Sequence, residues 1–317
     1  MTDQSVLAIV GPTASGKTAL SILLAETLGG EIISADSRQI YRCLDIGTAK
    51  PVPEELKRTT HHFINILNPD QFYNAGEYGI QARAKIDELL KQHKQPILVG
   101  GSGLYVRAVI DGFFEGPGKN MEVREQLEHE AHTLGSEILF ERLNKFDPIS
   151  AAKMDATKVR RVIRALEVYY TTGKPISDLH FIQESKIPFA TLQFGLQWER
   201  KILYQRIERR IDEMIENGLI EEVQGLVAQG YSRSANALNT VGYKEVFDYL
   251  DGKTTLEEMI RLIKQNTRHF AKRQLTWFRA DKRIRWISVQ DEINSSEIVE
   301  LIQKEFRSAH KNTSSPN

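Results

Sequence analysis

The chain has 317 residues, of which 41% are hydrophobic and 26% are charged, proportions that are ordinary for a soluble globular protein. Its 42 basic and 42 acidic residues leave no net charge, which argues against a protein that binds nucleic acid over its whole surface. The single cysteine, Cys43, excludes an intramolecular disulfide and a cysteine-based zinc site. No apolar run approaches the roughly 20 residues that a membrane span requires. We therefore expect a cytoplasmic protein without membrane contact, in which Cys43 is partly buried.

Short apolar runs rich in β-branched residues predict buried parallel strands. They are Val6–Val10, Glu31–Ala35, Pro96–Gly100, Thr191–Trp198 and Ile284–Val289. Helical patterns lie between the first three runs, and the first of these helices, Lys17–Leu28, ends at Gly29-Gly30. This alternation predicts βαβ units and a doubly wound α/β core.

Helical patterns alone fill the stretch between Gly112 and Pro188. They are Met121–Leu134, Ser136–Lys145 and Ala156–Thr172. Because strand patterns resume at Thr191, we predict a helical insertion domain over residues 113–190. The α/β core is then formed by residues 1–112 and 191–317.

Helices return in the last third of the chain, from Glu199 to Arg279. One of them carries an apolar stripe and ends at Gly218. The stripe consists of Leu203, Ile207, Ile211 and Met214. The tail over residues 308–317 is expected to be disordered.

The first predicted strand runs directly into GPTASGKT, which has the G-x-x-x-x-G-K-T spacing of a phosphate-binding loop. Backbone N–H groups of such a loop point inward, and the following helix adds partial positive charge at its N-terminus. Lys17 would supply a point charge, and Thr18 a hydroxyl ligand for Mg²⁺. The residues predicted to bind phosphate are Gly11, Pro12, Thr13, Ala14, Ser15, Gly16, Lys17 and Thr18.

The acid that usually holds the metal of an ATPase is missing, because the third strand continues into LVGGSGLY, residues 98–105. This argues against a motor or a kinase. An acid follows the second strand instead, and Asp36 should lie at the same edge of the sheet as the phosphate loop. A carboxylate there would repel an anion, so Asp36 indicates chemistry or metal binding. Helix capping by Asp36 or Ser37 is the structural alternative.

A local basic bias stands out from Arg261 to Arg285, where nine Lys and Arg residues face one acid, Asp281. Aromatic residues, Trp277 and Phe278 among them, are interleaved with these cations. Such a patch can bind a polyanion although the whole molecule is neutral. In the alternative interpretation the two aromatic residues belong to the core, and the arginines are solvated or line the phosphate site.

Several stretches, in this order, closely resemble the bacterial tRNA dimethylallyltransferase family. They are GPTASGKT, ISADSRQIYRCLDIGTAKP (33–51), HHFINI (61–66), PILVGGSGLYVRAV (96–109), RRVIRALEV (160–168), RIERRIDEMIENGLIEEV (206–223), NTVGYKE (239–245) and TRHFAKRQLTWFR (267–279). The resemblance runs from about residue 6 to 290. It implies a P-loop α/β fold and transfer of a dimethylallyl group from dimethylallyl diphosphate to N6 of an adenosine. That adenosine lies 3′ of the anticodon in tRNAs that read codons beginning with U.

The resemblance also implies roles for individual residues. Asp36 would be the general base, and the loop would hold the diphosphate of the prenyl donor together with Mg²⁺. Further donors to the departing diphosphate would be Thr13, Lys17, Ser102 and Arg210. Arg206, one helical turn from Arg210, is also expected to bind the diphosphate. The residues expected to contact the tRNA anticodon stem-loop are Asp36, Ser37, Arg38, Gln39, Ser102, Arg124, Arg160, Arg161, Val162, Ile163, Arg164, Asn239, Thr240, Val241, Gly242, Tyr243 and Lys244. A monomer is the family's usual state.

Three other functions stay open on the sequence. The first is an adenylate isopentenyltransferase that uses AMP or ATP as acceptor; the helical insertion and the basic C-terminal region favour tRNA over it. The second is a P-loop kinase of a small metabolite. The third is a non-catalytic RNA-binding module.

Overall fold

The computed structural model describes residues 5–112, 118, 120–182, 188–290 and 295–313. The chain forms two compact units, one made of Met1–Asp111 with Ile187–Asn317 and the other of Gly112–Lys186. The second unit lies within a few residues of the range 113–190 that the sequence predicts for an insertion.

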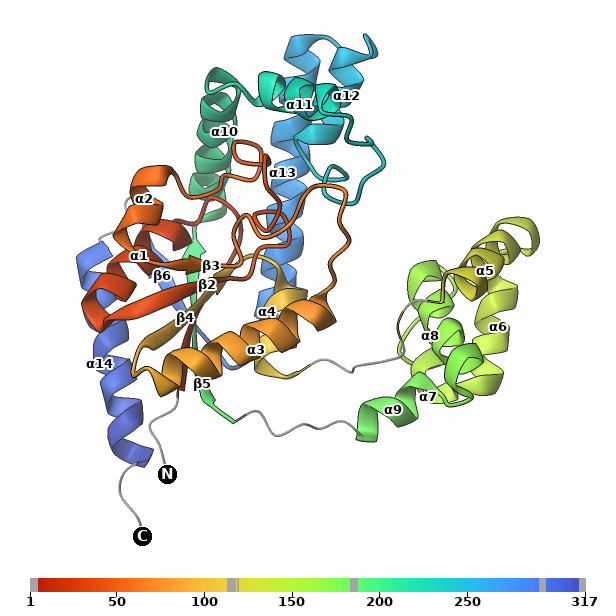
Figure 1. Ribbon diagram of the computed structural model, residues 1–317, viewed down its shortest axis with the longest axis horizontal. Coiled ribbons are helices and arrows are strands. Elements are labelled where there is room, and N and C mark those ends of the chain that lie inside the picture. Colours follow the sequence, from red (N-terminus) through yellow and green to blue (C-terminus); the bar gives the residue numbers. More distant parts are fainter. Residues whose placement is uncertain (1–4, 113–117, 119, 183–187, 291–294, 314–317) are drawn as a thin grey trace. The chain divides into compact units, whose positions relative to one another are not determined.

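The larger unit is built on a six-stranded parallel sheet with the order β3-β2-β4-β1-β5-β6 (Figure 1). Its strands are β1 (Ser5–Val10), β2 (Gly30–Ser34), β3 (His61–His62), β4 (Gln95–Gly100), β5 (Ala190–Trp198) and β6 (Ile284–Val289). The five strands predicted from apolar runs are confirmed to within one residue at each end. The sequence missed β3, because two histidines at the edge of the sheet carry no apolar pattern. The side chains of Val6–Val10 are fully buried, as expected for a strand covered on both faces.

The strand order places the phosphate loop at a topological switch point. After β1 the chain forms β2 and β3 on one side of the sheet, and β4 then fills the position between β2 and β1. The following strands, β5 and β6, lie on the other side of β1, so the direction of the connections changes between β4 and β1. Ligands of open α/β sheets bind outside the carboxyl ends of the strands at such a point. The loops after β1, β2 and β4 therefore meet at one edge.

The helices of the larger unit lie on both faces of the sheet and beyond the carboxyl end of β5. They are α1 (Lys17–Leu28), α2 (Pro53–Arg58), α3 (Ala75–Lys91), α4 (Gly103–Ile110), α10 (Arg200–Glu216), α11 (Leu219–Ala228), α12 (Tyr243–Leu250), α13 (Leu256–Arg279) and α14 (Ser295–Thr313). The pairs α1–α14 and α3–α4 pack on opposite faces, while α10 to α13 gather beyond the carboxyl end of β5 (Figure 1). The apolar stripe of α10 is confirmed, because Leu203, Ile207 and Ile211 are buried.

Two expectations about single segments are wrong. The predicted disordered tail is helical as far as Thr313, because α14 buries Ile298, Ile302 and Phe306 against the core; residues 314–317 lie outside the described part. Cys43 is exposed at a turn of the loop after β2, while its neighbour Leu44 fills the core position. None of the described helices combines the length and the apolar character that crossing a membrane demands.

The smaller unit is helical throughout its described residues. Its helices are α5 (Met121–Leu134), α6 (Ser136–Phe146), α7 (Pro148–Ala151), α8 (Val159–Thr172) and α9 (Ile176–Ile182). They enclose a separate apolar core that includes Leu127, Leu139, Leu143 and Leu166. The predicted starts of the helices at 121 and 136 are confirmed, while α8 begins three residues later than the pattern indicates.

Candidate active site

A cavity of about 540 Å³ opens at the carboxyl edge of the sheet. It is lined by the loops after β1, β2 and β4, by α10 and α13, and by the segment before α12. The predicted site residues that line it are Thr13, Ala14, Lys17, Thr18, Asp36, Ser37, Arg38, Gln39, Ser102, Arg210, Asn239, Thr240, Val241, Gly242 and Lys244. Residues from distant parts of the chain thus meet in one cavity.

The phosphate loop has the backbone that the motif requires. Gly16 adopts φ +88° directly before α1, a left-handed conformation that favours glycine, and Ala14 adopts φ +60°. The loop therefore curls so that α1 starts at Lys17, with its N-terminus at the cavity. Lys17 Nζ donates to the carbonyl oxygen of Pro12 at 2.6 Å, across the loop.

The outer side of the loop is braced by β5 and α10. Trp198 Nε1 donates to the Ser15 carbonyl at 3.0 Å, and Arg206 Nε donates to the Ala14 carbonyl at 2.9 Å. The Arg206 guanidinium lies 4.3 Å from the centre of the Trp198 ring. Through these contacts Arg206 braces the loop from α10, and its binding of the diphosphate stays a prediction.

Gln274 joins the phosphate loop to the loop after β4. Its Oε1 accepts from the Thr13 N–H at 2.8 Å, and its Nε2 donates to the Gly101 carbonyl at 2.9 Å. Its side chain is almost fully buried. Sequence reasoning missed both Gln274 and Trp198. For Gln274 the available signal was a polar residue on the buried stripe of a helix, inside the motif AKRQLTWFR.

Two cations share the inner part of the cavity with one carboxylate. Burial, together with the charge of Arg210, lowers the pKa of Lys17 from 10.5 to about 7, while the charge of Asp36 opposes the change. Burial also lowers the pKa of Arg210, again opposed by Asp36. Arg210 Nη1 donates to Thr13 Oγ1 at 3.2 Å, at the rim of the loop. Cations held together with little surrounding water favour an anionic ligand.

Asp36 is fixed through only one of its two oxygens. Its Oδ1 accepts from the backbone N–H of Arg38 at 2.8 Å and from that of Gln39 at 3.4 Å. Residues 37–40 form a turn and not a helix, so these contacts stabilise that turn and are not the helix cap that the sequence left open. Within the described residues Oδ2 has no hydrogen-bond partner, so the carboxylate is both oriented and able to accept a proton.

Ser102 lies beside Asp36 and not on the phosphate loop. Its Oγ accepts from the Ser37 N–H at 3.0 Å and donates to Ser37 Oγ at 3.2 Å, while its N–H donates to the Ala35 carbonyl at 3.2 Å. These contacts join the ends of β2 and β4. They hold the turn that carries the carboxylate.

The segment before α12 approaches the same turn. Arg38 donates to the carbonyl oxygens of Asn236 at 2.5 Å and Asn239 at 3.5 Å. Lys244 is exposed, whereas Tyr243 is fully buried. The predicted tRNA contact by the Tyr243 side chain is therefore wrong, because the ring packs in the core.

In the smaller unit, burial separates the predicted tRNA residues into two groups. Arg160 and Arg161 are exposed at the start of α8, whereas Val162 and Ile163 are 1% and 3% exposed and belong to the core. A side-chain contact of these two apolar residues with RNA is excluded by their packing. Cations in the first turn of a helix oppose its dipole, so the exposed arginines favour an anionic partner.

The other two arginines predicted for the smaller unit have acidic neighbours. Arg164 pairs at 3.1 Å with Glu167, which is buried. Arg124 lies 3.5 Å from Glu128 on its own helix. Their charges are therefore partly balanced within the protein.

The basic run 261–285 is less positive in the fold than in the sequence. Five of its nine cations form ion pairs with carboxylates: Arg261 with Glu258, Lys264 with Asp212, Arg268 with Glu208, Arg283 with Asp111 and Asp281, and Arg285 with Glu305. These pairs reduce the positive charge that the run can offer to a polyanion. The two aromatic residues of the run differ. Phe278 is 2% exposed and belongs to the core, whereas Trp277 is 39% exposed.

Comparison with known proteins gives consistent results. The IPP transferase family matches over residues 39–281. The tRNA dimethylallyltransferase of Pelotomaculum thermopropionicum is 48% identical over 302 residues, which cover 95% of this chain and 96% of that protein. The enzyme of the same name from Thermotoga maritima is 45% identical over 299 residues, covering 94% and 97%.

Solved structures agree in fold and sequence. The tRNA isopentenylpyrophosphate transferase of Bacillus halodurans superposes with a TM-score of 0.73 and 40% identity, covering 98% of this chain and 99% of that one. A eukaryotic dimethylallyltransferase acting on tRNA gives a TM-score of 0.81 at 28% identity, covering 96% and 80%. With its phosphate loop and carboxylate in one cavity, the chain belongs to the IPP transferase family of tRNA dimethylallyltransferases.

Proposed function

We propose that the protein transfers a dimethylallyl group from dimethylallyl diphosphate to N6 of the adenosine immediately 3′ of the anticodon, in tRNAs that read codons beginning with U. The observation that carries this proposal is the presence of the phosphate loop and Asp36 in one cavity. The names of the relatives favour tRNA over AMP as acceptor and prenyl transfer over a kinase reaction. We propose a cytoplasmic monomer as its working form.

The chemistry has two demands. An adenine amine is a poor nucleophile, because its lone pair is delocalised into the ring. Oδ2 of Asp36 would accept the proton that N6 loses, while the contacts of Oδ1 keep the carboxylate oriented. As the bond from N6 to the allylic carbon forms, the bond from that carbon to the diphosphate oxygen breaks.

The departing diphosphate gathers negative charge during this step. Donors that meet this charge lower the barrier. The loop N–H groups, Lys17 and Arg210 are placed for this role, with the Thr13 hydroxyl held by Arg210. Both cations are partly buried, which strengthens their interaction with an anion because less water competes for them than at the surface.

Mg²⁺ fits the loop through Thr18. This residue lines the cavity, and its hydroxyl makes no hydrogen bond within the described residues. Mg²⁺ usually keeps one or two protein ligands and takes the rest from phosphate oxygens and water. When bound, the ion would neutralise part of the diphosphate charge.

The acceptor base has to leave the anticodon loop to reach Asp36. Flipping a nucleotide out of its stack costs a few kcal/mol, which contacts with the protein must offset. We propose that Ser37, Arg38 and Gln39 hold the flipped nucleotide. Residues 239–242 and Lys244, together with the exposed Arg160 and Arg161, would contact the surrounding RNA.

Mass analysis of nucleosides tests the proposal. Purified protein, Mg²⁺ and dimethylallyl diphosphate are incubated with unmodified tRNA or with AMP. We expect N6-isopentenyladenosine in the tRNA digest and no prenylated AMP. Label in AMP alone would instead favour an adenylate isopentenyltransferase, and ATP-dependent phosphorylation without a prenyl donor would favour a kinase.

A further inference from the structure

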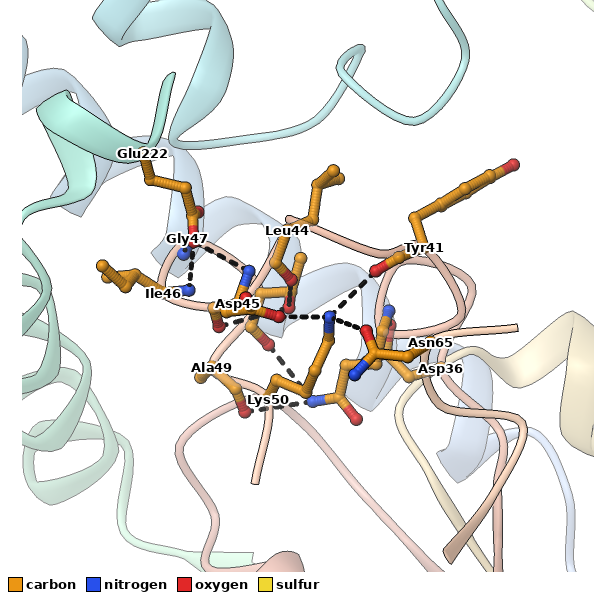
Figure 2. Close-up of polar contacts among 12 residues, drawn as sticks. Asp36, Tyr41, Leu44, Asp45, Ile46, Gly47, Ala49, Lys50, Asn65 and Glu222 are labelled. Carbon is orange, nitrogen blue, oxygen red and sulfur yellow. Dashed lines mark hydrogen bonds and ion pairs between the residues drawn. The ribbon is translucent and has the colours of Figure 1, made fainter. Parts of the chain in front are cut away.

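One carboxylate outside the cavity holds the backbone of a segment that lines it. Glu222 lies in the first turn of α11, and its Oε2 accepts from the N–H groups of Asp45 at 2.8 Å and Ile46 at 2.7 Å. Its Oε1 accepts from the Gly47 N–H at 3.1 Å and from the Tyr243 hydroxyl at 2.6 Å. Four donors thus converge on one side chain, and Figure 2 shows the contacts with Ile46 and Gly47.

A buried lysine fixes the other end of the same segment. Lys50 Nζ donates to the Tyr41 carbonyl at 2.8 Å, to Asp45 Oδ1 at 2.5 Å and to Asn65 Oδ1 at 2.6 Å (Figure 2). All three ammonium hydrogens therefore have acceptors. We call residues 44–50 the wall segment.

The wall segment has a costly conformation. Ala49, and Cys43 directly before the segment, adopt φ +47° and +62°, in the left-handed region that non-glycine residues seldom occupy. Gly47 packs so closely against the Tyr243 ring that a Cβ at this position would lie 2.5 Å from Tyr243 Cε2, which leaves no room for a side chain. Such conformations persist only where the surroundings hold them, and they cluster at functional sites.

The wall segment in turn positions a predicted acceptor-binding residue. Gln39 Nε2 donates both hydrogens, to the carbonyl oxygens of Thr48 at 3.2 Å and Ala49 at 3.0 Å. The backbone N–H of Gln39 points to Asp36 Oδ1. Gly47, Thr48 and Ala49 also line the cavity. A chain of contacts therefore runs from Glu222 through the wall segment and Gln39 to the catalytic carboxylate.

The diphosphate side of the cavity has separate support. Trp198, Arg206, Arg210 and Gln274 brace the phosphate loop, and none of them contacts Glu222 through a hydrogen bond within the described residues. Loss of Glu222 should therefore disturb the acceptor side and spare the donor side.

We propose that Glu222 is a positioning residue for the acceptor nucleotide: it holds the wall segment so that Gln39 and Asp36 meet the adenine in reactive geometry. This inference rests on the proposed function. A misplacement of about 1 Å at a reacting centre can cost on the order of 10²-fold in rate, so the effect should be measurable.

The test compares Glu222→Gln with Glu221→Gln. Both changes remove one negative charge from the first turn of α11, but Glu221 is exposed. A glutamine at 222 has one acceptor oxygen, so at least one of the three backbone N–H groups must lose its partner. We expect kcat/KM for tRNA to fall on the order of 10–10²-fold in Glu222→Gln and to stay unchanged in Glu221→Gln. The affinity for inorganic pyrophosphate should stay at the wild-type value in both variants.

Hydrogen exchange adds a readout that does not depend on activity. The amides of Asp45, Ile46 and Gly47 should exchange faster in Glu222→Gln than in the wild type or Glu221→Gln. Tyr243→Phe, which removes one of the four donors and leaves the carboxylate, should give a smaller loss of the same kind. This variant carries the test if Glu222→Gln does not fold.

Two results would overturn the inference. One is an active wild type with Glu222→Gln and Tyr243→Phe as efficient on tRNA as Glu221→Gln. The other is a Glu222→Gln variant whose pyrophosphate affinity falls by the same factor as its kcat/KM for tRNA, which would mean that Glu222 supports the fold as a whole. A wild type that does not prenylate tRNA at all would refute the proposed function, a different failure that the same assay distinguishes.

Discussion

The side-chain oxygen of Gln274 accepts the backbone N–H of Thr13 at 2.8 Å, while the amide nitrogen of the same side chain donates to the Gly101 carbonyl. One residue of α13 thus fixes the distance between the phosphate loop and the loop after β4. Since these loops follow neighbouring strands at the switch point, Gln274 sets the width of the diphosphate end of the cavity.

Gln274→Ala should weaken pyrophosphate binding on the order of 10-fold, because the hydrogen bond to the loop is lost and the partly buried Thr13 N–H loses its partner. Isothermal titration with pyrophosphate and Mg²⁺ measures this, and tRNA affinity should not change. Gln274→Glu is the informative partner, since it keeps an acceptor for Thr13 but places an oxygen against the Gly101 carbonyl. Wild-type binding by both variants would contradict the bridging role.

Asp36→Asn should lower kcat about 10²–10⁴-fold, the usual contribution of a positioned general base. The amide oxygen of asparagine can still accept from the Arg38 N–H, so the turn, pyrophosphate binding and tRNA binding should be preserved. Single-turnover prenylation measures the chemical step directly, with the exposed Asp70→Asn as the matched control. An unaltered rate in Asp36→Asn would remove this residue from the base role.

The fold was predictable from sequence to a large extent, because buried parallel strands and a phosphate loop carry strong local patterns. β1, α1 and α5 are confirmed within a residue. The sequence could not show that Glu222 and Lys50 hold the wall segment, or that Gln274 joins two loops. Each of these contacts depends on which side chains the fold brings together over as many as 261 residues.

The same reason explains the errors in the tRNA-binding set. In the motif RRVIRALEV, exposed Arg161 is followed directly by buried Val162, and only the packing of α8 separates their roles. The ion pairs of the run 261–285 are a second case. Their acidic partners Glu208, Asp212 and Glu305 come from other helices, so a count along the run overstates its positive charge.

Diphosphate binding should take up a proton at alkaline pH through Lys17. Burial lowers the pKa of this side chain to about 7, so above that pH the free protein holds mostly neutral amine. An anion beside it favours the charged form and raises the pKa, so binding draws a proton from solution and affinity falls as pH rises above about 7. Below pH 7 the amine is already charged, and this dependence disappears.

Titration of pyrophosphate into the protein at pH 8, in buffers of different ionisation enthalpy, counts the protons taken up. Lys17→Met serves as the reference, because it retains the protonation of pyrophosphate itself and lacks the amine. The wild type should take up more protons than Lys17→Met at pH 8 and the same number at pH 6. If the wild type and Lys17→Met took up the same number of protons at pH 8, the protonation of Lys17 would not change on binding, and the predicted linkage would be wrong.

Arg161→Ala should weaken tRNA binding and reduce the slope of log Kd against log salt concentration by about 0.7–0.9, the value for one lost phosphate contact. The side chain is exposed at the first turn of α8, where an anion is favoured by the helix dipole. Filter binding of tRNA over a range of salt concentrations measures the slope. Lys174→Ala, an exposed cation beyond the other end of α8, is the control and should leave it unaltered.

Ile163→Ala separates the two roles that lie within this one helix. Because Ile163 is 3% exposed in the core of the smaller unit, truncation should lower the stability of that unit by about 2–5 kcal/mol and lower its melting temperature. The salt slope of tRNA binding should stay at the wild-type value as long as the unit is folded. If Ile163→Ala reduced the slope and Arg161→Ala did not, the contact with RNA would involve the apolar face of α8, and the packing of the smaller unit described above would have to change when tRNA binds.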